Sequence, residues 1–171
     1  MKRFSLLLLF GLLGGCIIIT PDPVIPTPIE IIDPSFETNV TANGQIAICS
    51  NRVTQIAYTF RHTGDLASWS SFLKGNTIGT EILRETYTPT TAGVEAVGTD
   101  GYRTTFNIAE NTAPYSAGTS GSTSKAIVVV PVPQPVQIGS SKLYLTLTGT
   151  GGDTKTHTFS DIPVIENCPT S

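Results

Sequence analysis

Short runs in which apolar and polar residues alternate are the feature that most limits what this chain can fold into. The run 142–148 (KLYLTLT) places a leucine at every second position, and the runs 45–49 (QIAIC) and 54–60 (TQIAYTF) repeat the pattern. Because successive side chains of an extended strand point to opposite faces, each run predicts a half-buried β-strand. We therefore expect an all-β protein built from short antiparallel strands.

Composition agrees with this expectation and limits the number of domains. Charged residues make up only 13% of the chain, whereas threonine, valine, glycine, serine and proline are frequent, as in β-sandwiches with many turns. Residues 111–124 (NTAPYSAGTSGSTS) are polar and rich in glycine and serine, which indicates a flexible loop or a linker. The strands expected after this stretch are too few to form a core alone. We expect one sandwich domain over 35–171 rather than two domains.

A hairpin turn is expected at Asp100-Gly101, between two β-prone runs. Glycine tolerates the positive φ that a type I′ turn requires. The turn predicts three cross-strand pairs: Thr99 with Tyr102, Val97 with Thr104, and Glu95 with Phe106. The last pair is a poor match, so a bulge or a longer loop is the alternative.

Residues 35–110 resemble a bacterial immunoglobulin-like domain. The likeness is carried by a "TP…AG" turn, a strand, an Asp-Gly turn and a closing strand, which correspond to Thr88-Pro89 with Ala92-Gly93, 94–99, Asp100-Gly101 and 102–108. The resemblance implies an immunoglobulin-like antiparallel β-sandwich. It also implies a domain of a kind that mostly binds partners or acts as a spacer.

One short inserted helix is expected within this sandwich, in the stretch 64–75 (GDLASWSSFLKG). Four large apolar residues of the stretch follow a helical spacing: Leu66, Trp69, Phe72 and Leu73. Asp65 fits an N-cap and Gly75 fits the end of the helix. The same spacing favours a core position for Trp69, the only tryptophan. The alternative is a Trp69 ring that stacks on a sugar, in a carbohydrate- or small-ligand-binding module.

The N-terminus indicates where the protein resides. Lys2 and Arg3 precede the apolar run 4–13, which is too short for a membrane-spanning helix of about 20 residues but is typical of a secretory signal. The following Leu13-Gly14-Gly15-Cys16 resembles the lipobox of bacterial lipoprotein precursors. The resemblance implies a signal peptide over 1–15, cleavage before Cys16, and acylation of Cys16 by a diacylglycerol and a further fatty acid.

This resemblance predicts an exported protein that is anchored to a membrane of the bacterial cell envelope through Cys16. Two or three acyl chains make a stable anchor, at about 0.8 kcal/mol per buried methylene. Ile17 is not an acidic retention signal, which favours the outer membrane in a cell that has one. Residues 16–34 contain five prolines after the cysteine and predict a semi-rigid tether of about 3.1 Å per residue. Alternatively, Ile29 to Ile32 pair as a first edge strand.

The remaining cysteines, Cys49 and Cys168, are predicted to form a disulfide. An exported compartment permits disulfides, and lipidation of Cys16 leaves an even number of thiols. The alternative is two buried free thiols, because free cysteine also packs as a small apolar side chain.

No cofactor is expected, and the charge balance argues against a nucleic-acid partner. Without residues 1–15 the chain has eight basic and 13 acidic residues, a net charge of −5, whereas nucleic-acid binding needs a basic surface. The stretch 149–156 (GTGGDTKT) is not a phosphate-binding loop, because Thr154 replaces the second glycine and no helix follows.

The sequence predicts no catalytic residues and no metal site. His62 and His157 are the only histidines, and a weak metal site or a hydrolase built on them is the least favoured alternative. No G-x-S-x-G nucleophile motif occurs. We therefore expect a lipid-anchored envelope protein that is not an enzyme and acts as a structural or protein-interaction module on an envelope protein partner. The carbohydrate- or small-ligand-binding module and the hydrolase or metal enzyme remain alternatives.

Overall fold

The computed structural model describes residues 25–76, 79–113 and 134–168. The predicted signal peptide, Cys16 and most of the predicted loop at 111–124 lie outside these residues. The described part contains twelve strands and no helix. The prediction of an all-β protein with antiparallel sheets is confirmed, although one short pair of strands, β4 with β12, is parallel.

Four strands form the first sheet, in the order β1-β5-β9-β8. Their bounds are β1 Glu30–Thr38, β5 Thr54–Thr63, β9 Gly101–Ile108 and β8 Val94–Ala96. Adjacent strands are antiparallel throughout this sheet. A separate two-stranded ribbon, β2 Thr41–Ala42 with β3 Gln45–Ile46, follows β1.

Six strands form the second sheet, in the order β4-β12-β10-β6-β7, with β11 also paired to β10. Their bounds are β4 Ile48–Cys49, β6 Leu66–Gly75, β7 Glu81–Tyr87, β10 Val136–Gly149, β11 Thr154–Thr158 and β12 Ile162–Glu166. The long strand β10 holds this sheet together, because β12 pairs with its first half and β11 with its second half along one side.

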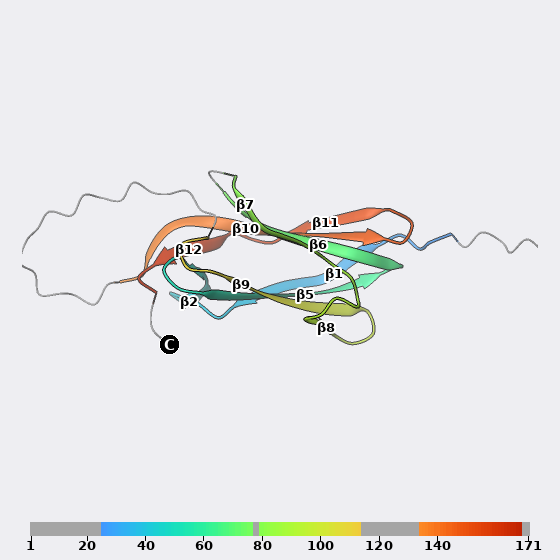
Figure 1. Ribbon diagram of the computed structural model, residues 1–171, viewed down its shortest axis with the longest axis horizontal. Coiled ribbons are helices and arrows are strands. Elements are labelled where there is room, and N and C mark those ends of the chain that lie inside the picture. Colours follow the sequence, from blue (N-terminus) through green and yellow to red (C-terminus); the bar gives the residue numbers. More distant parts are fainter. Residues whose placement is uncertain (1–24, 77–78, 114–133, 169–171) are drawn as a thin grey trace, which may run out of the picture.

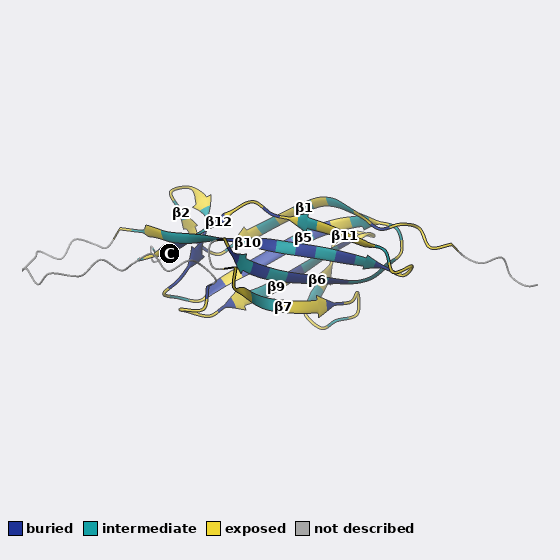
Figure 2. Cartoon of the chain, turned by 90° about the horizontal axis from the view of Figure 1, so that it is seen from above, coloured by how far each residue is buried: buried dark blue, intermediate teal, exposed yellow. Residues whose placement is uncertain are grey.

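The two sheets lie face to face as the layers of a sandwich (Figure 1). Along β6 and β10 the buried residues alternate with more exposed ones (Figure 2), whereas β5 has three buried residues in succession at 56–58. The largest fully buried side chains come from both sheets: Trp69, Tyr58, Phe60, Ile48, Ile56, Leu73, Ile108, Leu143, Leu145, Leu147, Ile162 and Val40. Strands on both sides of residues 111–124 therefore share one core.

The predicted helix in 64–75 is wrong, because Leu66–Gly75 is strand β6. Trp69, Ser71 and Leu73 are buried at alternate positions, and the intervening side chains point to the outer face. Leu66, Trp69 and Leu73 fit both a period of two, after a bulge, and a helical spacing. Pairing with β10 on one side and β7 on the other decides in favour of the strand.

The predicted pairs around Asp100-Gly101 are also wrong. The observed pairs are Val94 with Thr104, Glu95 with Arg103, and Ala96 with Tyr102. The turn is a longer loop, closed by a hydrogen bond from the Val97 N–H to the Gly101 carbonyl (2.8 Å). In this register Val94 packs against the core, whereas Val97 is left exposed.

The predicted boundary between tether and domain at residue 34 is several residues too late. Strand β1 begins at Glu30, and Ile29 is buried in the core, as in the alternative in which Ile29 to Ile32 form an edge strand. The chain enters the sandwich at one end, called here the tether end, and the two cysteines lie at the opposite end, called here the disulfide end (Figure 1).

Candidate functional site

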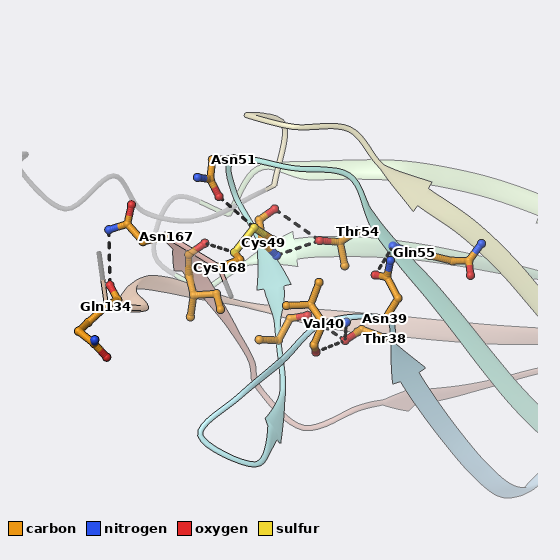
Figure 3. Close-up of a disulfide and its surroundings, with 12 residues drawn as sticks. Thr38, Asn39, Val40, Cys49, Asn51, Thr54, Gln55, Gln134, Asn167 and Cys168 are labelled. Carbon is orange, nitrogen blue, oxygen red and sulfur yellow. Dashed lines mark hydrogen bonds between the residues drawn. A yellow bond between two sulfur atoms is a disulfide. The ribbon is translucent and has the colours of Figure 1, made fainter. Parts of the chain in front are cut away.

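Cys49 and Cys168 form the predicted disulfide at the disulfide end (Figure 3). Their Cα atoms are 6.1 Å apart, and the bond joins positions separated by 119 residues. Cys49 is fully buried, its N–H donates to the Thr54 hydroxyl (2.8 Å), and a small apolar cluster with Val40, Ala47 and Ile165 surrounds it. The disulfide therefore fastens the segment that follows β12 to strand β4, which precedes β5.

Trp69 lies in the core, which removes the residue proposed for sugar stacking. Its side chain is fully buried and packs against Phe60, Tyr87 and Tyr102. The indole Nε1 donates to the Tyr58 hydroxyl (3.2 Å). Because no face of the indole ring is open, Trp69 cannot stack on an external ligand in this structure.

His62 and His157 lie in different sheets, on β5 and β11. The His62 ring stacks on Tyr102 with centroids 5.9 Å apart, and the His157 ring meets Phe159 edge-on at 4.7 Å. The Nδ1 atom of His62 is buried and has no hydrogen-bond partner among the described residues. Within these residues, no three His, Cys, Asp or Glu side chains gather in a way that could hold a metal ion.

Two aspartates fix the entering chain at the tether end. The Thr27 N–H donates to Asp65 Oδ2 (3.1 Å), and the Ile29 N–H donates to Asp153 Oδ2 (2.6 Å). Glu30 adds an ion pair with Lys155 (2.8 Å). The last residues of the predicted tether are thus bound to the turns that follow β5 and β10.

A shallow groove lies on the outer face of the first sheet, along β1 and β5. The sequence did not predict it. It consists of two adjoining hollows, of about 130 Å³ and 170 Å³, that share Glu37, Ala57 and Arg103. Its remaining lining is Thr38, Asn39 and Gln55 in one hollow, and Ser35, Phe36 and Thr59 in the other. Ala57 lies opposite Glu37 in the sheet, and its small side chain leaves the space that the groove occupies.

Arg103 forms one wall of the groove and is held there by two carboxylates. Its guanidinium pairs with Glu37 and, at 3.9 Å, with Glu95. About a third of the Arg103 side chain remains exposed. The two charged side chains that line the groove, Arg103 and Glu37, are therefore paired with each other.

The alternation in 54–60 was the one sequence signal for this groove. It places Gln55, Ala57 and Thr59 on one face of a strand, opposite the buried Ile56 and Tyr58. The contributions of Glu37 and Arg103 could not be inferred, because they depend on the registers of β1 and β9 against β5.

Side-chain amides are confined to the disulfide half of the sandwich. Strands β1 and β9 run toward the disulfide end, and Asn39 and Asn107 lie close to their last residues. Strands β5 and β10 run away from this end, and Gln55 and Gln137 lie close to their first residues. Figure 3 shows Asn39, Asn51, Gln55, Gln134 and Asn167 around the disulfide. The other amide residues lie in the adjoining turns and strand ends: Asn43, Gln45, Asn76 and Asn111.

No protein-family model, curated protein or solved structure matches this chain. Residues 25–76, 79–113 and 134–168 include no helical segment that could span a membrane.

Proposed function

We propose that this protein is a lipid-anchored protein of the bacterial cell envelope that acts as a non-catalytic interaction module. Leu13-Gly14-Gly15-Cys16, after a basic start and a short apolar run, is the observation that carries the proposal. Acyl chains on Cys16 would fix the chain to the membrane, with the outer membrane as the favoured site. The domain would then bind an envelope partner.

The disulfide supports export from the cytosol. Stable disulfides form in oxidising compartments and are rare where thiols are kept reduced. Cys49 and Cys168 are the two cysteines that remain after lipidation of Cys16, and they are bonded to each other. The N-terminal segment enters at the end of the sandwich that lies away from this bond (Figure 1), so an anchored domain would present its disulfide end away from the membrane.

We also propose that the sandwich is a variant of the immunoglobulin fold. The order β1-β5-β9-β8 corresponds to strands A-B-E-D, and β12-β10-β6-β7 corresponds to G-F-C with an added C′. The buried Trp69 lies on β6, the counterpart of strand C. The disulfide differs, because Cys49 precedes the counterpart of strand B. A crystal structure with another strand order would refute this assignment.

Fractionation of cells that express the wild type and Cys16→Ala tests the anchor. We expect the wild type in the membrane fraction and the variant outside it, because the variant has no thiol to alkylate. In-cell crosslinking of the wild type then tests the interaction role. A reproducible crosslinked neighbour is expected, and a protein that stays uncrosslinked at the membrane would contradict that role.

A further inference from the structure

The groove over Ala57 is elongated and follows the strands of the first sheet. Its lining runs from Ser35 to Asn39 along β1 and from Gln55 to Thr59 along β5, about 13 Å at 3.3 Å per residue. Phe36 directs its ring inward, toward Phe159 between the sheets. The groove therefore fits an extended ligand that lies on the sheet and needs no deep pocket.

The groove is rich in groups that both donate and accept hydrogen bonds. Ser35 and Thr59 supply hydroxyls, and Asn39 and Gln55 supply amides, whereas the Thr38 hydroxyl is already bonded to the backbone of Val40 and Ala47. Each amide has two N–H donors and a carbonyl acceptor, which matches the paired donor and acceptor character of neighbouring sugar hydroxyls. The main-chain N–H of Gln55 donates to Asn39 Oδ1 (2.8 Å). This hydrogen bond to the neighbouring strand β5 fixes the orientation of the Asn39 NH₂ group.

A row of three amides borders one end of the groove. Gln55 pairs with Asn107 across β5 and β9, and Asn39 lies beside Gln55 on the other side. All three residues are exposed, and neither the Gln55 nor the Asn107 side chain has a hydrogen-bond partner among the described residues. Unlike Asn43, Asn111 and Asn167, these three do not have a positive φ. A left-handed turn conformation therefore does not explain why asparagine or glutamine occupies these positions.

The charge of the groove favours a neutral ligand. Arg103 is paired with Glu37 and Glu95, so an anion would compete with two carboxylates for one guanidinium. A cation would compete with Arg103 for Glu37. Hydroxyl groups can instead bond to the exposed edges of the paired charges, and such charge-assisted hydrogen bonds are the stronger ones.

The groove suits a polypeptide less well. Peptides are usually recognised at a free sheet edge or in pockets that take apolar side chains. Here β1 and β5 are paired with each other beneath the groove, and Ala57 is the only apolar side chain on its floor.

We propose that this groove binds a strand of a neutral polysaccharide, with Gln55, Asn39 and Arg103 as hydrogen-bonding residues and Ala57 as the floor. The inference rests on the proposed function, because it names the partner of an exported interaction module. It also moves the carbohydrate-binding alternative from the buried Trp69 to a surface that a sugar can reach.

Nuclear magnetic resonance titration of the full-length mature protein in detergent micelles tests the proposal. The neutral probes are chitohexaose, cellohexaose and maltohexaose. An oligogalacturonate is the anionic probe, and denatured casein is the polypeptide probe. We expect at least one neutral oligosaccharide to shift the side-chain amide signals of Gln55 and Asn107. At about 10 mM a site with a Kd of about 1 mM is nearly saturated, so an absence of shifts for all three would overturn the proposal.

Variants then locate the binding surface. Ala57→Phe fills the groove and should weaken binding at least tenfold, and Gln55→Ala should weaken it severalfold without adding bulk. Ser70→Phe is the matched control, because it places the same ring on the outer face of the second sheet; its binding should equal that of the wild type. Retained dispersion of the amide spectrum shows that each variant is folded.

Two further outcomes would refute the proposal. Phe72 and Tyr144 stack on the outer face of the second sheet with centroids 4.8 Å apart, which makes them a rival sugar-stacking surface. Loss of binding in Tyr144→Leu together with normal binding in Ala57→Phe would place the glycan there instead. Binding of casein or of the oligogalacturonate alone would show that the partner is not a neutral glycan. None of these results bears on lipidation of Cys16, so the anchor and the ligand are tested separately.

Discussion

Trp69 and Tyr58 link the two sheets through a hydrogen bond in the centre of the core. The indole of Trp69, on β6, donates to the phenol oxygen of Tyr58, on β5, and this phenol donates to the Ser71 hydroxyl (3.1 Å). Trp69 and Tyr58 are fully buried, and Ser71 nearly so. Satisfied polar groups of this kind specify how two sheets pack, because an unpaired one would be costly.

Replacement of the tryptophan should destabilise the fold without affecting the surface. We expect Trp69→Phe to lower the free energy of unfolding by about 2–4 kcal/mol, through a cavity and a lost hydrogen-bond donor. Urea denaturation measures the change. Tyr144→Phe, on an outer face, is the control and should change stability by no more than about 0.5 kcal/mol. Equal stability of Trp69→Phe and the wild type would contradict the core position of this ring.

Two buried phenols predict that stability falls at alkaline pH. Burial raises the pKa of Tyr87 and of Tyr58 above the ordinary value of 10.0. Between pH 10 and the raised pKa values, the unfolded chain ionises these phenols while the folded protein keeps them protonated. Stability should therefore be complete below pH 10 and fall above it, by at most about 1.4 kcal/mol per pH unit for each phenol.

Urea unfolding at a series of pH values from 7 to 11 checks this expectation. Tyr87→Phe removes one of the two phenols, so its loss of stability above pH 10 should be shallower than that of the wild type. Identical profiles for the two proteins would show that Tyr87 ionises equally well in the folded and unfolded states.

The disulfide should supply a large share of the stability. Cys49 and Cys168 close a loop across 119 positions, for which the chain-entropy model gives roughly 5 kcal/mol. We expect Cys49→Ala/Cys168→Ala to unfold at a markedly lower urea concentration than the wild type. Addition of a reductant should destabilise the wild type and leave the double variant unchanged. A wild type that is insensitive to the reductant under unfolding conditions would contradict this role.

The strands were predictable where one face of a run is buried and the other is exposed. Leu143, Leu145 and Leu147 alternate along β10 and are all fully buried. Prediction failed where the apolar spacing of a helix coincides with that of a strand, because Leu66, Trp69 and Leu73 fit both. The deciding influence is the pairing of β6 with β10 and β7, which no local pattern encodes.

Most of the candidate groove could not be predicted from the sequence either, because it also depends on strand pairing. The strand pattern places Gln55 and Ala57 on an outer face, but Arg103 and Glu37 reach them only through the registers of neighbouring strands. The disulfide could be predicted from the sequence, because only Cys49 and Cys168 remain once Cys16 is assigned to lipidation. Trp69 was correctly placed in the core, although on a strand and not on a helix.

The aspartates at the tether end should hold the entering chain against the sandwich. Asp153→Ala removes the acceptor of the Ile29 N–H, and loss of a hydrogen bond to a charged group costs about 1.5–3 kcal/mol. We expect hydrogen exchange at the Ile29 amide to accelerate at least tenfold. Asp161→Ala removes a carboxylate that pairs with Lys142 on the surface (3.3 Å) and serves as the control. Equal exchange at Ile29 in both variants would show that Asp153 does not hold the segment.

Mass spectrometry of the N-terminal peptide of the protein, purified from its native membrane, tests the central claim most directly. The account predicts a chain that begins at Cys16 and carries a thioether-linked diacylglycerol, with or without a further fatty acid on the new amino group. A peptide that retains residues 1–15, or one that begins at Cys16 with a free thiol, would contradict it.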